Sequence, residues 1–176
     1  MLSTLRMILI ALLVSMQAAG FCSAENSTDR EPSPEIRIFS TWGGFLEADR
    51  CAAAWAIRRF VEPDARFRIH PPQTMQMEGT AFDVSLPGPY TRQPKMTMLD
   101  TILAAHKVQD PAAMRLAAVI RDIELNRWAE KKTLEAPGIE AVIRGLNRVA
   151  RDEQDCLEKS LIIFESLYED FKGPQK

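Results

Sequence analysis

Cysteine and histidine are scarce in this sequence. There are three cysteines and two histidines among 176 residues. The histidines, His70 and His106, lie far apart, and neither belongs to a metal-ligand spacing such as two histidines four residues apart on a helix or a close cysteine pair. We therefore predict no metal site and no cofactor.

Motifs for nucleotide and nucleophile chemistry are also lacking. The chain has no glycine-rich phosphate loop, no GxSxG elbow and no CxxC pair. Charge of neither sign dominates, because 22 Lys and Arg residues face 24 Asp and Glu residues, for a net charge of −2. Nucleic-acid-binding proteins show a concentrated basic face, so we expect no nucleic-acid partner.

The one long hydrophobic run lies at the N-terminus. Residues 7–19 are almost entirely apolar, Arg6 precedes them, and Cys22, Ser23 and Ala24 follow. This order is typical of a secretory signal peptide, and we predict residues 1–24 to be that peptide, with cleavage after Ala24. The alternative is an uncleaved single-pass anchor, for which the run is short. The sequence thus predicts an exported protein, periplasmic or secreted, with no membrane contact after cleavage.

The remainder is long enough for one domain with a core. Residues 25–35 are polar and proline-bearing, which predicts a flexible leader. Residues 36–173 show no internal repeat and no second boundary, so we predict a single domain there. Cys51 and Cys156 remain after cleavage, and they either form a disulfide in an oxidising compartment or are buried separately as small hydrophobic residues.

The apolar pattern predicts strands first and helices later. Alternating segments indicate strands at residues 36–42, 65–70 and 80–86. Helical spacing covers residues 47–61, 97–107 and 111–128, and two further helices begin at Pro137 and near Asp152. The helix from Pro137 is expected to turn one apolar face inward, formed by Ile139, Val142, Ile143, Leu146 and Val149. The predicted fold class is α+β, predominantly helical, with a small N-terminal strand region packed on a C-terminal helical bundle.

Arginines and carboxylates on two of these helices form the main candidate site. The central helix carries Asp49, Arg50, Arg58 and Arg59, and the helix from residue 111 leads to Arg121, Glu124 and Arg127, which are spaced three apart on one face. Guanidinium groups bind oxyanions through paired hydrogen bonds. If the two helices face each other, the set forms an anion pocket. The alternative is a group of surface ion pairs, each worth about 0–1 kcal/mol.

Two other clusters have simpler interpretations. Asp152, Glu153 and Asp155 open the last predicted helix, where acids complement the helix dipole. Methionines gather around the irregular middle of the chain and are either soft ligands for Cu(I) or adaptable packing, namely Met75, Met77, Met96 and Met98.

Several segments resemble the chromate-resistance exported protein family, the domain that forms the C-terminal part of the regulator ChrB. They are DRCAAAWAIRRFVEPDARF, GTAFDV, VIRDIELNR and ARDEQDCLEKSLIIFESLYEDF. The resemblance covers roughly residues 39–171. The residues that match its most specific signature are Asp49, Arg50, Trp55, Ile57, Arg58, Arg59, Phe60, Glu62 and Pro63. Further matches are Phe82, Asp83, Asp100, Arg121, Glu124, Arg127, Arg151 and Asp152.

The resemblance also has departures. Ala53 and Ala54 stand where the family has Cys and Pro before Trp55, so thiol chemistry at that position is not expected here. The longer ChrB proteins carry an N-terminal part linked to regulation, and this chain has a predicted signal peptide in its place. A transcriptional role is therefore not expected.

The resemblance implies a protein that binds or senses a small, chromate-like oxyanion. The arginines that would bind it are Arg50, Arg58, Arg59, Arg121 and Arg127, with Asp49 and Glu124 holding them in place and Asp152 as a further site residue. One alternative is a reductase or hydrolase that uses the carboxylates of Asp49, Glu124 and Asp152. The other is a non-catalytic interaction module whose arginine network is purely architectural.

Overall fold

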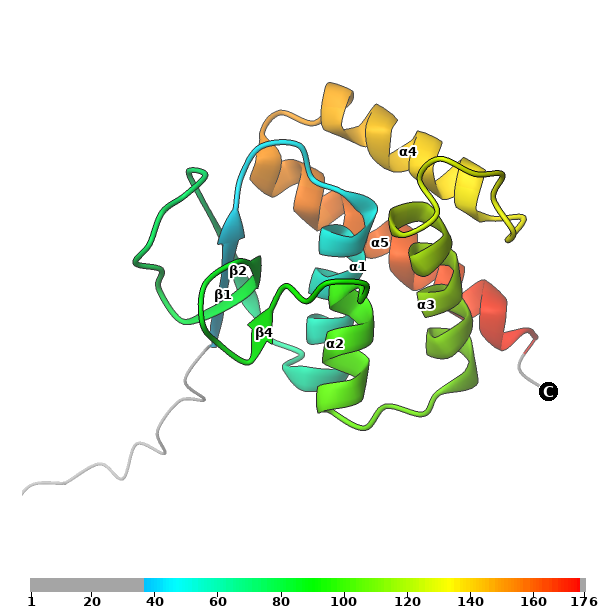
Figure 1. Cartoon of the computed structure of the whole chain (residues 1–176), viewed down its shortest axis with the longest axis horizontal. Coiled ribbons are helices and arrows are strands. Elements are labelled where there is room, and N and C mark those ends of the chain that lie inside the picture. The colour runs from blue at the N-terminus through cyan, green and yellow to red at the C-terminus, as the bar shows by residue number, and fades with distance from the viewer. Residues whose placement is uncertain (1–36, 175–176) are drawn as a thin grey trace, which may run out of the picture. The chain divides into compact units, whose positions relative to one another are not determined.

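In the computed structural model, which describes residues 37–174, strands and helices alternate early and helices alone follow (Figure 1). The described residues fall in one unit, Pro34–Lys176. The elements are β1 (Ile38–Trp42), α1 (Ala48–Ala56), the π-helix η1 (Ile57–Val61), β2 (Arg66–His70), β3 (Thr80–Val84), β4 (Tyr90–Thr91), α2 (Met98–Ala105), α3 (Pro111–Glu124), α4 (Ala136–Val149) and α5 (Glu153–Lys172). The predicted signal peptide and leader lie outside the described residues.

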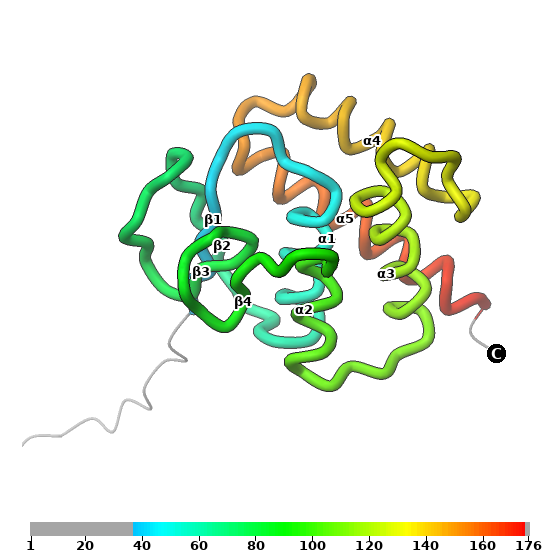
Figure 2. Tube along the Cα trace, in the orientation of Figure 1, coloured from blue at the N-terminus to red at the C-terminus, as the bar shows by residue number. Residues whose placement is uncertain are grey.

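The strands form one parallel sheet in the order β2-β1-β3-β4 (Figure 2). α1 and η1 connect β1 to β2, so the chain first extends the sheet on one side of β1. It then crosses to place β3 on the other side. The connections that leave the carboxyl ends of β1 and β3 thus run to opposite sides of the sheet, and open parallel sheets leave a crevice at such a point. The predicted mixed fold is confirmed, with a fourth strand, β4, that alternation did not indicate.

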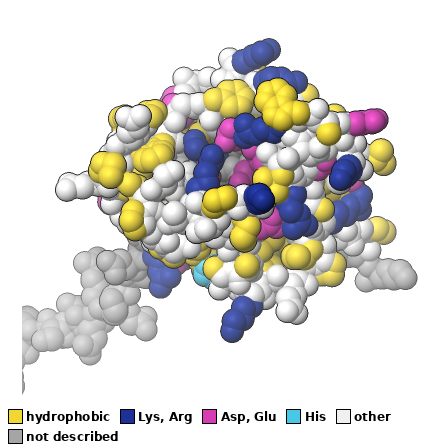
Figure 3. Space-filling model, viewed as in Figure 1, with side chains coloured by type: hydrophobic (Ala, Val, Ile, Leu, Met, Phe, Trp, Pro, Cys, Tyr) yellow, Lys and Arg dark blue, Asp and Glu magenta, His cyan; other side chains and the backbone are white. Residues whose placement is uncertain are grey.

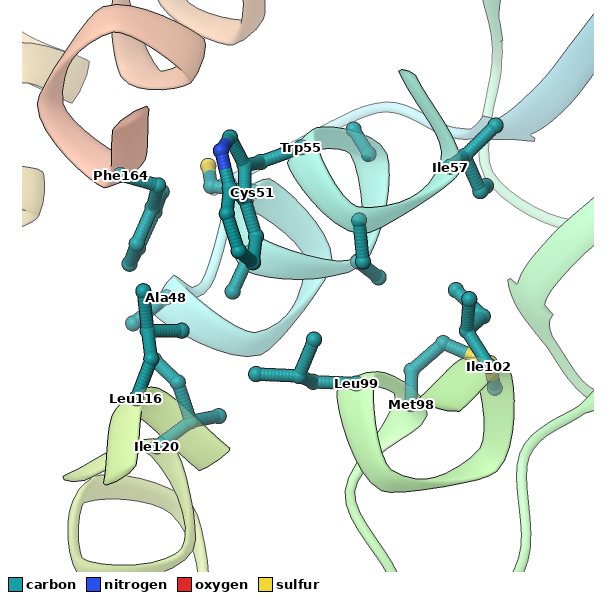
Figure 4. Packing of buried hydrophobic residues seen from close by; sticks show 14 of the residues in the cluster. Ala48, Cys51, Trp55, Ile57, Met98, Leu99, Ile102, Leu116, Ile120 and Phe164 are labelled. Atoms are coloured by element: carbon teal, nitrogen blue, oxygen red, sulfur yellow. The ribbon is translucent and has the colours of Figure 1, made fainter. Parts of the chain in front are cut away.

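Helix α1 lies at the centre of the core. All nine of its residues are buried, and its alanines let neighbouring helices approach closely. Leu99 of α2, Leu116 and Ile120 of α3 and Phe164 of α5 belong to the apolar cluster around it (Figure 4). A helix that is buried on every side has no solvent-exposed face. A charged residue on α1 therefore needs partners inside the protein.

Three of the other helices, α2, α3 and α5, begin where local capping signals predict. Thr97, Asp110 and Asp152 each accept a hydrogen bond from the backbone amide three residues on. α3 ends at Glu124 instead of the predicted residue 128. The reason is Asp122, which accepts hydrogen bonds from the backbone amides of Lys132 and Thr133 and so folds the chain back.

Helix α4 packs less of its apolar face than predicted. Ile143 is buried, but Val142 is 47% exposed and Val149 is 75% exposed. The prediction that these two valines point inward is wrong because α4 lies at the outside of the fold and touches the core along one narrow strip (Figure 1). In the part of the chain that is described, no helix is long and apolar enough to cross a bilayer.

Candidate functional site

Arg50 joins the carboxyl ends of the two central strands. It lies in the first turn of α1, and its Nε donates to Asp83 Oδ2 over 2.7 Å. Its Nη1 donates to the carbonyl oxygen of Trp42, the last residue of β1, over 2.8 Å. Both members of the Arg50–Asp83 pair are buried. The guanidinium group therefore sits between the ends of β1 and β3, at the switch point of the sheet.

Asp83 also holds a second arginine. Arg92 donates from Nε to Asp83 Oδ1 over 2.9 Å and from Nη2 to Oδ2 over 3.0 Å. Asp83 has a φ of 53°, in the left-handed region that aspartate adopts more readily than most residues. Such backbone strain persists where surrounding contacts fix it, and it often marks sites of function.

The network continues from Arg92 onto helix α3. Arg92 donates to Glu47 over 3.3 Å, and Arg127 donates to the other oxygen of Glu47 over 3.1 Å. Arg127 also donates to Glu124 over 2.7 Å. Glu47 immediately precedes α1, and Glu124 ends α3. We call the connected set the edge network, and its members are Arg50, Asp83, Arg92, Glu47, Arg127 and Glu124.

A cavity of about 380 Å³ opens beside this network. We call it the edge cavity, and its lining residues are Phe45, Glu47, Ala48, Ile123, Glu124, Arg127, Trp128, Glu140, Ile143 and Arg144. Ala48 of the first turn of α1 forms part of the lining, so the positive end of the α1 dipole lies beside the cavity. The space-filling view shows acidic and basic side chains gathered in the middle of one face (Figure 3). The edge cavity is thus both charged and open to solute.

Burial changes the acidity of the carboxyl groups nearby. It raises the pKa of Glu124, with further repulsion from Glu47, although a hydrogen bond from Arg127 opposes the rise. It raises the pKa of Asp49 to about 7, against hydrogen bonds from the backbone amides of Leu99 and Met98. At Glu47 burial acts in the same direction, but Arg127 and Arg92 outweigh it and the pKa falls below its usual value. The pKa of Glu124 is thus raised and that of Glu47 lowered, so Glu124 takes up a proton more readily than Glu47.

Asp49 lies next to this site, but its side chain does not hold an arginine in place as expected. Its oxygens accept from the backbone amides of Met98 and Leu99, over 2.5 and 2.9 Å. It thereby caps the start of α2 from a neighbouring helix, which satisfies amides that α2 leaves free. The expectation that Asp49 holds an arginine is replaced by this capping role.

Arg58 and Arg59 lie at the opposite end of the central helix. They follow Arg50 by eight and nine residues, a rise of about 12 Å. Arg58 pairs with Glu158 over 2.9 Å and Arg59 with Glu165 over 3.0 Å. Both carboxylates belong to α5, and the two arginines line a separate groove of about 550 Å³. They therefore do not meet the edge network.

Arg121 and Asp152 are also elsewhere. Arg121 pairs with Asp100 of α2 over 2.8 Å, and both line a third cavity. Asp152 accepts from the backbone amide of Asp155 over 2.8 Å and caps α5. The structure thus brings Arg50, Glu124 and Arg127 into one network and leaves the other predicted arginines apart.

Sequence reasoning missed three members of the edge network, namely Glu47, Asp83 and Arg92. Asp83 carried one usable signal, because it lies at the end of a predicted strand and within a segment that resembles the family. Glu47 and Arg92 carried none, since one lies at the start of a predicted helix and the other in an irregular segment, and they meet only when the chain folds.

The remaining cysteines and the common metal-ligating side chains can also be placed. Cys51 and Cys156 are both buried and both free. Within residues 37–174, no group of three or more His, Cys, Asp or Glu side chains is arranged to hold a metal ion.

Comparison with known proteins places the chain in a family. The family model described as "ChrB, C-terminal domain" matches residues 40–171. Protein ChrB of Cupriavidus metallidurans (strain ATCC 43123 / DSM 2839 / NBRC 102507 / CH34) is 28% identical over 133 residues, which are 74% of this chain and 40% of that relative. No solved structure matches. The matched range contains the whole edge network, and we conclude that the chain belongs to the ChrB C-terminal domain family.

Proposed function

We propose that this protein binds a small tetrahedral oxyanion, with chromate as the first to test, in the edge cavity. The observation that carries the proposal is the position of the half-exposed Arg127 guanidinium, in a cavity that the first turn of α1 also lines. Helix N-termini favour anions, and ligands of open parallel sheets bind at this edge. Chromate is chosen because the sequence resembles chromate-resistance proteins.

The buried part of the network supports this site by holding its shape. Arg50 and Asp83 fix the ends of β1 and β3 relative to α1, and Asp83 holds Arg92. Arg92 then holds Glu47, which orients Arg127. A guanidinium group that is oriented before binding loses less conformational freedom when it binds an anion. In this proposal Arg127, with Arg144, contacts the ligand, and Arg50 acts by positioning.

The exposed ion pairs of the cavity are exchangeable. Arg127 has 51% of its side chain exposed, so its pairs with Glu47 and Glu124 are each worth about 0–1 kcal/mol. A doubly charged oxyanion forms stronger, charge-assisted hydrogen bonds with the same guanidinium group. The ligand can thus replace a carboxylate without disrupting the buried pair behind it.

The geometry favours binding over carboxylate catalysis. Of the three carboxylates considered for an enzyme, only Glu124 lines the edge cavity. Asp49 is turned toward α2, and Asp152 caps α5. Acid–base mechanisms with two carboxylates need both groups at one substrate. We also propose, from the predicted signal peptide, that the protein acts after export.

Calorimetric titration of the purified protein with chromate and with sulfate tests the proposal. The titration uses low ionic strength, because salt screens exposed charges. We expect both anions to bind and Arg127→Gln to weaken binding about tenfold or more. Arg59→Gln is the matched control, since Arg59 pairs with a carboxylate at the far end of the helix. Absence of binding, or equal losses in both variants, would contradict the proposal.

A further inference from the structure

Glu124 already occupies the place in the edge cavity that suits an anion. Its side chain is 11% exposed and accepts a hydrogen bond from Arg127 over 2.7 Å. The backbone amide of Asp49, in the first turn of α1, opposes the rise in the pKa of this carboxyl group, and Ala48 of the same turn lines the cavity. A guanidinium group and a helix N-terminal amide are the contacts an oxyanion would seek. The Glu124 carboxylate therefore occupies the position that an anionic ligand would take.

The charged groups around Glu124 disfavour the binding of another anion while the Glu124 carboxylate is ionised. Glu47 faces it from the residue just before α1, and Asp49 faces it from the first turn of α1. Arg127 follows it in the chain, and Glu140 and Arg144 line the cavity from α4. Within the lining, the two arginines are outnumbered by the three glutamates, Glu47, Glu124 and Glu140. Arg92 and Lys131, outside the lining, pair with Glu47 and Glu140. A dianion that approaches Arg127 therefore meets its repulsion chiefly from Glu124, which pairs with that arginine, unless the charge of Glu124 is removed.

We propose that an oxyanion binds by displacing Glu124 from Arg127 and from the first turn of α1, and that Glu124 takes up one proton from solvent as it leaves. This inference rests on the proposed function and specifies its ligand as a tetrahedral dianion that binds together with a proton. The raised pKa of Glu124 agrees with it, because burial and the neighbouring Glu47 already favour the protonated form.

Among the three glutamates of the cavity, Glu124 is the one suited to this exchange. Glu47 accepts from two arginines, Arg92 and Arg127, which hold its pKa below the usual value. Glu140 lies within 3.8 Å of Lys131 and is partly exposed. Glu124 has one arginine partner and the deepest burial of its side chain. Protonation of Glu124 thus frees Arg127 while breaking only one ion pair of the cavity.

Proton uptake makes binding depend on pH in a defined way. If one proton accompanies each dianion, affinity rises about tenfold for each pH unit of acidification while Glu124 is ionised in the free protein. Sulfate is the appropriate probe, because it stays a dianion across neutral pH and contributes no proton of its own.

The experiment is calorimetry of the full chain with sulfate, between about pH 6 and about pH 8, in two buffers of different ionisation enthalpy. The difference between the buffers counts the protons taken up. We expect nearly one for the unmodified protein and nearly none for Glu124→Gln, which should also bind more tightly at the higher pH. Glu165→Gln removes a comparable arginine partner at the far end of α1 and should leave the count unchanged.

The outcomes separate this inference from the proposed function. Sulfate binding without proton uptake, or with the same uptake in Glu124→Gln, overturns the exchange and leaves oxyanion binding intact. Absence of sulfate binding in the unmodified protein overturns both. If Glu124→Gln does not fold, as judged by circular dichroism, the proton count of the unmodified protein decides the matter alone.

Discussion

Two carboxylates in the interior, Asp49 and Asp83, are held in different ways. Asp83 faces two guanidinium groups, those of Arg50 and Arg92, so its charge is compensated. Asp49 is hydrogen-bonded to backbone amides of α2, and a full opposite charge is not among these partners. Amide dipoles compensate a buried charge less well than a cation does. This difference accounts for the raised pKa of Asp49.

The raised pKa of Asp49 predicts a stability that falls as pH rises. Between the unfolded value of 3.8 and the folded value of about 7, the native state keeps a proton that the unfolded chain has lost. Stability should therefore decrease across this window, by roughly 4 kcal/mol in total, and level off above it. Asp49→Asn cannot titrate and should lack this decrease.

Urea unfolding of both proteins at a series of pH values measures the effect. The difference between their free energies of unfolding cancels other titrating groups, except those that touch Asp49. Parallel pH profiles would show that Asp49 is ionised in the native protein throughout.

At the scale of elements, the close approach of β3 to β1 depends on a glycine. Gly79 precedes β3 and has a φ of 70°. A side chain there would collide with the backbone carbonyl of Ile38 in β1. The pairing of β1 with β3 begins at the next residue, where Thr80 lies opposite Phe39. The strand ends that flank Arg50 thus depend on a residue without a side chain.

Replacing this glycine should separate the two strands. Gly79→Ala combines an unfavourable φ with a backbone collision, so we expect a loss of unfolding free energy of about 2 kcal/mol or more. Gly138→Ala is the matched control, because Gly138 lies in α4 with open space around it. Alanine favours a helix there, and stability should rise by about 0.5–1 kcal/mol. Thermal unfolding of both variants checks the pair, and equal changes would contradict the role of Gly79.

At the scale of the whole molecule, the two cysteines report on the integrity of the core. Cys51 on α1 and Cys156 on α5 are buried where these helices pack together. Burial raises the pKa of the Cys51 thiol to about 12, and it raises the pKa of Cys156 as well. Both thiols are therefore protonated and shielded at neutral pH, and a thiol in that state reacts slowly.

Alkylation should then require unfolding. In native buffer we expect both thiols to react on the order of a thousandfold more slowly than in denaturant, because reaction waits for rare opening. Mass spectrometry of the peptides that contain Cys51 and Cys156 follows each thiol separately. Rapid labelling of either one without denaturant would show that α1 and α5 do not seal the core as described.

Most of the helices and strands could be predicted from the sequence, because the residue patterns that indicate them lie within short stretches of the chain. Thr97, Asp110 and Asp152 act on amides three residues away, so helix starts could be predicted from short stretches. The family resemblance is local in the same sense, because it rests on short motifs. The end of α3 and the exposure of Val142 could not be predicted, because each depends on what another segment contacts.

The sequence alone determined that the protein is a mixed fold of the ChrB C-terminal domain type, rich in paired arginines and acids. Which charges share a site was decided only by tertiary structure. Arg50 and Arg58 lie on one continuous helical segment, yet the helical rise separates them and directs them to different partners. Arg50 pairs with Asp83, which is 33 residues further along the chain, and Arg127 pairs with Glu47, which precedes it by 80 residues. Electrostatic contacts act over a few ångströms, so the path of the whole chain sets the membership of the site.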